Sequence, residues 1–466
     1  MALSNPDKKI NPMSNKGSDV QSTTVPKEKV IKHIVLLQGP VGPFMDRLHR
    51  HLLDGGYRVT RFIFNAGDRW FSSRLKGQIS FNGSLVGWNR EFERFLLADR
   101  PDMVVCFGSE RPAHKIAREL TGEQAIPLLS LEEGYLRPGF VTVEAGGNNA
   151  SSPLAGSIPS AEINAEALHA EVANPTDYKS FSSFVRYSGT YYIIRTFFSW
   201  KSDRELFHRR FFPPLEAFYW LRNAYRNVFH GGADNPIIHR LLEHHPSNYF
   251  IVPLQVAADS NLKEAAKGWN SQRLIVSSIQ SFAKHARQDS QLVFKVHPLE
   301  RGHNRFESLI QEVSKDHGVL GRVHLIDTGS MGLLARHSAG MITINSTSGL
   351  SAIHHGVPLL VIGKAVYEHP KLAVCGNGKP DFDSFWHYSE NYPPVAPVAF
   401  RHEYLDWLRQ QALVRGDFYD TEGIKVACAG VQTRIEAIIR SRGFSDVGQS
   451  VSESDDEPCA DLAVSL

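Results

Sequence analysis

Several features that would define a protein class are missing from this chain. Its four cysteines, at positions 106, 375, 428 and 459, are scattered among 466 residues and form no CxxC pair. This scarcity and spacing argue against a zinc site or a disulfide framework and fit a reducing cytosol. The net charge is only +2, so no global electrostatic field favours a nucleic acid as partner.

Long hydrophobic runs are also missing. No apolar segment reaches the ~18–20 residues that a membrane-spanning helix needs. The N-terminal segment, MALSNPDKKINPMSNKGSDVQSTTVPKEK, contains no apolar stretch of the kind that a secretory signal carries. We therefore expect a cytoplasmic protein that touches a membrane only peripherally.

Neither common signature of a phosphate-binding loop is present. The segment QGPVGP at 38–43 follows an apolar run, but it lacks the Gly-Lys-Ser/Thr ending of a P-loop and the GxGxxG spacing of a dinucleotide site. We interpret it as a pocket for an acceptor, shaped by backbone and shared with the polar residues that end the next apolar run. The residues predicted to contact the acceptor here are Gln38, Gly39, Gly42, Asn65 and Asp68.

Short apolar runs alternate with helical patterns between residues 31 and 131, and again between 248 and 362. This alternation predicts parallel sheets covered on both faces. Two Rossmann-like domains, a helical insertion and C-terminal closing helices describe a GT-B-like α/β fold. The predicted parts are a disordered tail (1–29), an acceptor-side domain with a catalytic carboxylate (30–150), an aromatic and basic helical insertion (151–245), a donor-side domain (246–400), closing helices (401–444) and an acidic disordered tail (445–466).

The segment MITINSTSGLSAIHHGV at 341–357 is the most informative. An apolar run ends at Asn345, and a helical pattern begins at Gly349. A turn between a strand and a helix presents unpaired backbone N–H groups and the positive end of the helix dipole, which together bind phosphate. Ser346, Thr347 and Ser348 serve equally well as a helix cap, and the two roles are compatible. The predicted contacts to a phosphorylated donor are Asn345, Ser346, Thr347 and Gly349.

A second apolar run, 292–296, ends in His297-Pro298. Pro298 favours extended backbone at His297, and Lys295 lies two residues earlier, on the same face of the predicted strand. His297 is therefore a candidate donor to a phosphate oxygen, although a lone His-Pro pair is also typical of an ordinary buried histidine. Three residues after the run 248–254 are expected to read sugar hydroxyls or a base: Gln255, Asp259 and Ser260.

Two adjacent carboxylates, Glu132 and Glu133, follow the apolar run 126–131. Gly134 permits close approach, and Arg137 would keep a carboxylate ionised by charge pairing. An ionised carboxylate can act as a nucleophile or general base. A solvated acidic turn is the alternative, but ligands of open α/β sheets bind at strand ends, which favours a functional role.

The stretch 145–240 is rich in aromatic and basic residues. These residues either pack a helical subdomain or form a surface that touches an acceptor or lipid headgroups. Arg209 and Arg210 are the predicted contacts to an acceptor phosphate or to anionic headgroups.

Taken as a set, these motifs resemble the bacterial capsule polysaccharide β-Kdo transferases. More narrowly, they resemble the shorter, initiating enzyme, which places the first Kdo on a phosphatidylglycerol lipid. More distantly, the acidic pair, the His-Pro and the Ser/Thr turn resemble bacterial sialyltransferases that use CMP-sugars. The matching segments are QGPVGPF (38–44), NAGDRWF (65–71), LEEGYLRPGFVTVE (131–144), HRR (208–210), PLQVAADSNL (253–262), KVHP (295–298) and NSTSGLSAIHHGVPLLVIG (345–363).

The resemblance implies a GT-B fold, CMP-β-Kdo as donor, retention of configuration, a phosphatidylglycerol-type acceptor, and no metal or other cofactor. By position, Glu133 matches the family's catalytic carboxylate, while His297 and the Ser346–Thr347 turn match its contacts to the CMP phosphate. Related enzymes have Asp where this chain has Glu133, so the choice between Glu132 and Glu133 stays open.

The implied partners are the inner-membrane surface, a chain-extending Kdo transferase and the export complex, with no nucleic acid. Two alternatives remain at this stage. One is a transferase that uses CMP-sialic acid or another nucleotide sugar, and the other is a non-catalytic assembly or export subunit that keeps a GT-B shell.

Overall fold

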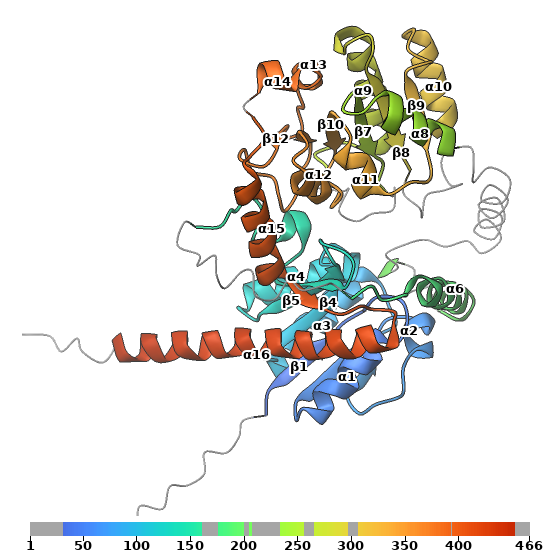
Figure 1. Cartoon of the computed structure of the whole chain (residues 1–466). Coiled ribbons are helices and arrows are strands. Elements are labelled where there is room, and N and C mark those ends of the chain that lie inside the picture. Colours follow the sequence, from blue (N-terminus) through green and yellow to red (C-terminus); the bar gives the residue numbers. More distant parts are fainter. Residues whose placement is uncertain are drawn as a thin grey trace, which may run out of the picture. The chain divides into compact units, whose positions relative to one another are not determined.

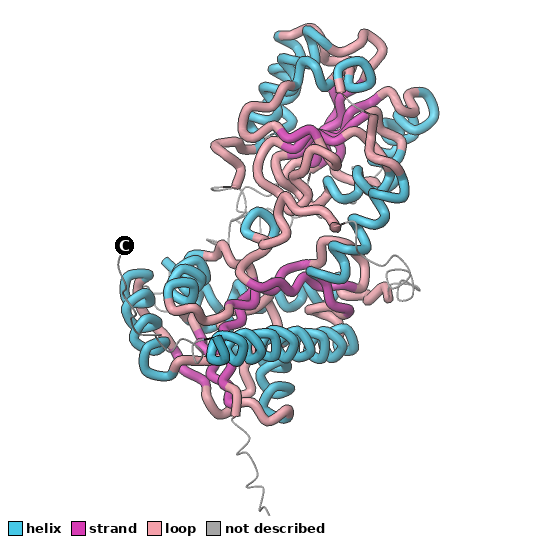
Figure 2. Tube along the Cα trace, turned by 90° about the vertical axis from the view of Figure 1, so that its left-hand side faces the viewer, coloured by secondary structure: helices cyan, strands magenta, loops and turns pink. Residues whose placement is uncertain are grey.

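The structure is a computed structural model that describes residues 31–160, 176–199, 205–206, 234–255, 265–296, 306–392 and 394–452. The elements described below lie in one compact unit that begins at Lys32. Within it, the strands form two separate sheets, and Figure 2 shows helices flanking each group of strands. The two sheets confirm the predicted α/β fold with two Rossmann-like halves.

The first sheet is built mainly from the N-terminal third of the chain. Its strands, in spatial order, are β13 (Leu413–Arg415), β6 (Phe140–Ala145), β5 (Leu128–Glu133), β4 (Met103–Phe107), β1 (His33–Leu36), β2 (Arg58–Ile63) and β3 (Gln78–Ser80). The strands from β5 to β3 are parallel, as the apolar runs predict.

The other end of this sheet departs from the parallel prediction. Strand β6 pairs antiparallel with β5, and β13 pairs antiparallel with β6. The β5–β6 connection is a tight turn, because a Cβ at Gly134 would lie only 2.2 Å from the carbonyl oxygen of Phe140. Glu132 and Glu133 pair with Thr142 and Val141, so they are the last residues of β5 rather than part of the turn.

Alternate residues of the first sheet enter two different cores, as expected when both faces are covered. Ile34, Leu36 and Leu131 face helices α1 (Phe44–Asp54) and α16 (Thr421–Ser452). Val35 and Val104 face helices α3 (Leu85–Asp99) and α4 (Pro112–Glu123) on the other side. Figure 1 shows α16 running past α1, on which it packs.

The second sheet is built from the segment predicted as the donor-side domain. Its order is β12 (Val374–Cys375), β11 (Leu359–Val361), β10 (Gly340–Thr343), β7 (Tyr249–Pro253), β8 (Gln291–Lys295) and β9 (Val323–Ile326). Every pairing is parallel. The helices that alternate with these strands are α9 (Ser271–His285), α10 (Phe306–Asp316), α11 (Met331–Arg336) and α12 (Gly349–His355).

The remaining described helices are short or belong to the insertion and the C-terminal part. They are α2 (Ala66–Trp70), η1 (Asn149–Ser151), α6 (Phe181–Phe198), α8 (Asp234–His244), α13 (Phe382–Phe385), α14 (Tyr388–Asn391) and α15 (Val398–Ala412). Two predictions at the C-terminal end need correction. Strand β13 interrupts the closing helices and joins the first sheet, and α16 continues to Ser452, into the segment predicted as a disordered tail.

Candidate active site

The site begins with the carboxylate of Glu133 at the carboxyl end of β5. Successive residues of a strand point to opposite faces, so Glu132 and Glu133 project in different directions. The phenolic hydroxyl of Tyr419 donates a hydrogen bond of 2.6 Å to Oε1 of Glu133. This contact joins two residues 286 positions apart in the chain.

Tyr419 is well placed to hold this carboxylate. It lies between β13 and α16, in a turn whose backbone N–H groups at 419 and 420 both donate to Oδ1 of Asp417 at 2.7 Å. Its ring packs edge-on against Phe184 of α6, 5.0 Å between centroids. Burial and the adjacent Glu133 carboxylate raise the pKa of Tyr419 well above its ordinary value. The phenol therefore stays protonated and remains a donor to Glu133.

Two guanidinium groups act on the same region. Arg111 and Arg137 lower the pKa of Tyr419 electrostatically, although burial and Glu133 outweigh them. Nε of Arg137 donates to the carbonyl oxygen of Gly134 at 3.0 Å. This contact braces the turn after Glu133, and the predicted charge pairing of Arg137 with a carboxylate stays a prediction.

The second part of the site is the turn between β10 and α12. The sequence predicts unpaired backbone N–H groups in this turn, but most of them donate hydrogen bonds within the turn itself. The N–H of Ser346 donates to Oγ1 of Thr343, and that of Ser348 donates to Oγ of Ser346. The N–H of Gly349 donates to the carbonyl oxygen of Ser346. Within the described residues, the N–H of Thr347 is left without such a partner, so the turn offers one free donor rather than a row of them.

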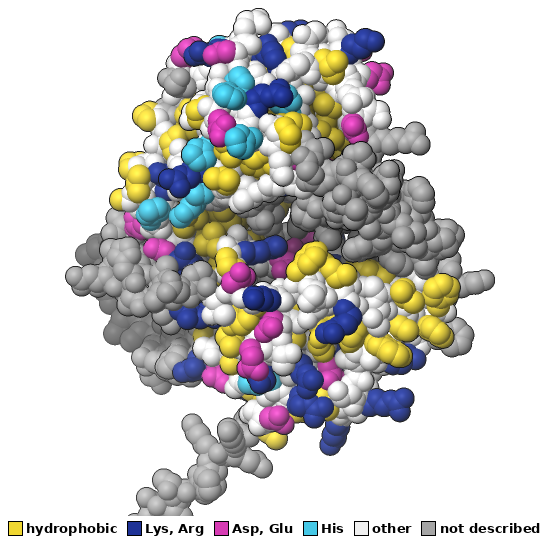
Figure 3. Space-filling model, turned by 45° about the vertical axis from the view of Figure 1, so that its right-hand side comes forward, with side chains coloured by type: hydrophobic (Ala, Val, Ile, Leu, Met, Phe, Trp, Pro, Cys, Tyr) yellow, Lys and Arg dark blue, Asp and Glu magenta, His cyan; other side chains and the backbone are white. Residues whose placement is uncertain are grey.

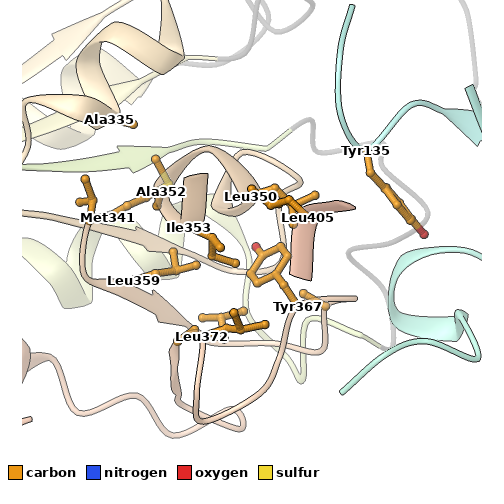
Figure 4. Packing of buried hydrophobic residues seen from close by; sticks show 14 of the residues in the cluster. Tyr135, Ala335, Met341, Leu350, Ala352, Ile353, Leu359, Tyr367, Leu372 and Leu405 are labelled. Atoms are coloured by element: carbon orange, nitrogen blue, oxygen red, sulfur yellow. The ribbon is translucent and has the colours of Figure 1, made fainter. Parts of the chain in front are cut away.

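The side chains of Gln255 and Tyr367 hold the backbone of this turn in place. Asn345 is fully buried and makes two hydrogen bonds with Gln255. Nε2 of Gln255 donates to Oδ1 of Asn345 at 2.8 Å, and the backbone N–H of Asn345 donates to Oε1 of Gln255 at 3.2 Å. The hydroxyl of Tyr367 donates to the carbonyl oxygen of Ser346 at 2.5 Å. Figure 4 shows Tyr367 among the buried side chains of this half, with Leu350 and Leu405 nearby. The predicted donor residues Gln255 and Asn345 are therefore brought together as a support for the turn.

A chain of polar contacts links the Glu133 hairpin to this turn. Tyr135, two residues after Glu133, donates to Oε2 of Glu144 at 2.5 Å and accepts the backbone N–H of Asn149. Nδ2 of Asn149 then donates to the carbonyl oxygen of Asn345 at 3.2 Å. The two predicted halves of the site are thus connected through buried groups.

The residues predicted to contact the acceptor form a third cluster, which is buried. Oδ1 of Asp68 accepts the hydroxyl of Tyr191 at 2.8 Å, and Nδ2 of Asn65 donates to the same hydroxyl at 2.9 Å. Nε2 of Gln38 donates to both Asp68 and Tyr191. A Cβ at Gly42 would lie 2.8 Å from the ring of Tyr187. The structure therefore brings these residues together, but their observed partner is α6, and direct contact with an acceptor stays a prediction.

Replacing Tyr191 with Phe should lower the free energy of unfolding by ~1–3 kcal/mol, because buried groups of Asp68, Asn65 and Gln38 lose a hydrogen-bond partner. Denaturant titration measures this change. Tyr187→Phe is the matched control, since its hydroxyl makes no hydrogen bond among the described residues while its ring packs near Phe71. Equal stability of the two variants would show that the cluster does not hold α6.

The remaining predicted site residues are either buried in structural contacts or lie outside the described part of the chain. Lys295 is buried at the end of β8, and its Nζ donates to the carbonyl oxygen of Thr328 at 3.0 Å. A Cβ at Gly39 would overlap Met45, so this glycine is needed for packing. The predicted residues that lie outside the described part of the chain are Arg209, Arg210, Asp259, Ser260, His297 and Pro298.

Sequence reasoning missed four residues that shape the site: Arg111, Asn149, Tyr367 and Tyr419. Tyr367 and Tyr419 are tyrosines in buried positions, a pattern that on its own indicates ordinary core packing. Only the fold places their hydroxyls against Ser346 and Glu133.

Among the described residues, no group of three or more His, Cys, Asp or Glu side chains is arranged to hold a metal ion. Among the same residues, no helix has the length and hydropathy required to cross a membrane.

The two Rossmann-like sheets and the carboxylate at a strand end define an α/β protein of the GT-B-like class. A family model described as "Capsule polysaccharide biosynthesis protein" matches residues 102–419. The chain belongs to this family, which confirms the capsule family predicted from the motifs.

Curated relatives share this capsule association. The Capsule polysaccharide export protein KpsS of Escherichia coli is 32% identical over 365 residues, which cover 76% of this chain and 90% of that protein. The Capsule polysaccharide modification protein LipB of Neisseria meningitidis serogroup A is 31% identical over 395 residues, which cover 83% of this chain and 92% of that protein.

Solved structures align with this chain at low TM-scores. The beta Kdo 2,7 transferase KpsC of Thermosulfurimonas dismutans has a TM-score of 0.39 at 12% identity, and the match covers 86% of this chain and all (100%) of that one. The UDP-GlcNAc 2-epimerase of Neisseria meningitidis has a TM-score of 0.31 at 13% identity, with coverage of 88% and 100%.

Proposed function

We propose that this chain is a retaining β-Kdo glycosyltransferase that moves Kdo from CMP-β-Kdo to a phosphatidylglycerol-type lipid, and thereby starts the lipid anchor of a capsule polysaccharide. The observation that carries the proposal is the Glu133 carboxylate, held at the end of β5 by the hydroxyl of Tyr419. Membership in the capsule family supports the pathway, as do the export and modification roles in the names of its relatives.

In the proposed first step, one carboxylate oxygen of Glu133 attacks the anomeric carbon of Kdo. The bond from that carbon to the phosphate oxygen of CMP breaks, and CMP departs with the electron pair. The phosphate is already a good leaving group, so little protonation is needed. The Thr347 N–H and the hydroxyls of the 345–349 turn are the proposed donors to the charge that develops on it. His297 is proposed to join them.

In the second step, a hydroxyl of the lipid attacks the same carbon and displaces Glu133, while its proton passes to a base or to water. Two inversions at one carbon give net retention. The hydrogen bond from Tyr419 orients Glu133 for the first attack and stabilises the free carboxylate when the second attack releases it.

The direct test combines the purified chain with CMP-Kdo and lysophosphatidylglycerol and analyses the products by mass spectrometry and NMR. We expect a lipid that carries β-linked Kdo. Transfer from CMP-sialic acid alone would identify a different nucleotide-sugar transferase. Consumption of CMP-Kdo no faster than in the absence of protein would favour a non-catalytic subunit, a role compatible with the word "export" in the name of the E. coli relative.

A chelator should leave this activity unchanged. CMP carries one phosphate, and backbone N–H, hydroxyl and imidazole donors can neutralise it without a divalent cation. The measurement compares turnover with EDTA and with EDTA plus excess Mg²⁺. Loss of turnover in EDTA that Mg²⁺ restores would contradict the proposed donor site.

A lipid acceptor implies work at a membrane surface. We propose that the chain acts in the cytoplasm, peripherally on the inner membrane, beside a chain-extending Kdo transferase and the export complex. Arg209 and Arg210, the predicted headgroup contacts, lie outside the described residues.

A further inference from the structure

Helix α6 carries apolar side chains on two sides. Phe184, Tyr187 and Tyr192 pack, partly buried, against the protein, while other apolar side chains on the outer side are exposed, which is unusual for a surface helix. The buried residues of α6 are Ser188, Tyr191 and Arg195. By contrast, Ile193, Phe197 and Phe198 are 48%, 66% and 71% exposed. Apolar side chains gathered on an exposed face are typical of a surface that binds a partner or a membrane.

The inner contacts of α6 exclude a simple rotation of the helix that would bury these side chains. The hydroxyl of Tyr191 is bonded to Asp68, Asn65 and Gln38. The guanidinium of Arg195 is buried and lies over the Tyr192 ring at 4.8 Å. Rotation would expose this polar network and break its hydrogen bonds, so the outward apolar face is a fixed property of the fold.

The apolar face continues onto the neighbouring helix α2. The N–H of Ala66 donates to Oγ of Ser199 at 3.0 Å, and Gly67 lies against the ring of Tyr191, so α2 packs on the C-terminal part of α6. On α2, Trp70 is 61% exposed. We call the set Trp70, Ile193, Phe197 and Phe198 the α2–α6 surface.

The two chain segments that carry this surface expose charges of one sign. In the segments 66–80 and 181–198, the exposed charged residues are all basic: Arg69, Arg74, Lys76 and Arg186. The acidic residue of these segments, Asp68, is buried. Figure 3 shows a face on whose lower half hydrophobic side chains gather, with Lys and Arg as well as Asp and Glu side chains among them. Exposed aromatics surrounded by basic residues are typical of surfaces that bind anionic bilayers.

We propose that the α2–α6 surface docks on an anionic bilayer, with its Trp and Phe side chains entering the headgroup boundary and its basic residues contacting lipid phosphates. Trp favours this boundary because its ring is apolar and its N–H is polar. A second copy of the chain is a poorer occupant, because a two-fold contact would set Arg69, Arg74, Lys76 and Arg186 against the same residues. The inference deepens the proposed function by placing the membrane contact, but lipid binding can be measured without any catalysis.

The test is co-sedimentation of the full chain with vesicles of phosphatidylcholine alone or of phosphatidylcholine mixed with phosphatidylglycerol. We expect binding to the mixed vesicles that weakens as salt is raised. The double variant Trp70→Ser/Phe197→Ser should bind at least ~10-fold less, because it removes two large apolar side chains from the boundary. Arg186→Glu should weaken binding to the mixed vesicles only.

Leu97→Ser is the matched control, since Leu97 is an equally exposed large apolar residue (69%) on α3, outside this surface. It should bind as the unaltered chain does. Circular dichroism and thermal unfolding check that the variants fold.

Unchanged binding of the double variant, or an equal loss in Leu97→Ser, would overturn the proposal. A concentration-dependent dimer that exists without lipid and disappears in the double variant would assign the surface to a second copy instead. If the double variant keeps turnover on a soluble acceptor but loses vesicle binding, docking is separate from catalysis. If no variant has transferase activity but binding behaves as expected, only the proposed function fails.

Discussion

Glu133→Gln should lower turnover by at least ~10³-fold while leaving CMP binding in place. The substitution keeps the size and the strand position of the side chain but removes the charge that attacks the anomeric carbon. Gln retains an oxygen that can accept the hydrogen bond from Tyr419, so the structure of the site should persist. Turnover is measured with CMP-Kdo and lysophosphatidylglycerol, and CMP affinity by calorimetry.

Glu132→Gln is the control for this experiment, because it changes the same chemistry on the opposite face of β5. It should retain most of the turnover. Tyr419→Phe should give an intermediate loss of about 10–100-fold, the effect of removing one hydrogen bond to a charged group. Near-normal turnover in Glu133→Gln, or a larger loss in Glu132→Gln, would move the catalytic role away from Glu133.

Gly349→Ala should weaken CMP binding at least ~10-fold and destabilise the fold by ~1–3 kcal/mol, the usual range for overpacking a core. A Cβ at this position would lie 2.3 Å from Oη and 2.4 Å from Cζ of Tyr367. Tyr367 is fully buried and supports Ser346, so either the ring or the donor turn must move. Calorimetric titration with CMP and thermal unfolding measure the two effects.

Gly332→Ala is the matched control. Gly332 lies inside helix α11, and a Cβ there would meet no atom closer than 3.6 Å. The substitution should be neutral or slightly stabilising, because Ala favours a helix over Gly by ~1 kcal/mol. If Gly349→Ala binds CMP as tightly as Gly332→Ala does, the 345–349 turn is not the donor site.

The apolar runs predicted most of the two sheets because buried parallel strands are continuous and apolar. The runs at 292–296 and 341–344 correspond to β8 and β10. Strand β6 was missed because it follows Glu133 through a hairpin, beyond the alternation of apolar runs and helical patterns that ends at residue 131. Strand β13 was missed because its three residues are too few to show the alternation of apolar and polar side chains that marks a strand. Its conformation is fixed by pairing with β6.

The positions of candidate site residues were predictable where a polar residue directly follows an apolar run. The polar residues that end β5, β7 and β10 were selected because ligands of α/β sheets bind at strand ends, and their contact with a ligand stays a prediction. The contacts that complete the site were not, because Tyr419 meets Glu133 and Asn149 meets Asn345 only through long-range packing. Conversely, Gln38, Asn65 and Asp68 look like binding residues in the sequence, and the fold uses them to hold α6.

In the proposed mechanism, Glu133 carries Kdo during transfer. Intact-protein mass spectrometry of the chain mixed with CMP-Kdo, without acceptor, tests it most directly. We expect a mass increase of one Kdo unit that peptide mapping assigns to Glu133, that disappears in Glu133→Gln and that is discharged by added lysophosphatidylglycerol. An adduct that maps to Glu132, or that persists in Glu133→Gln, would contradict it.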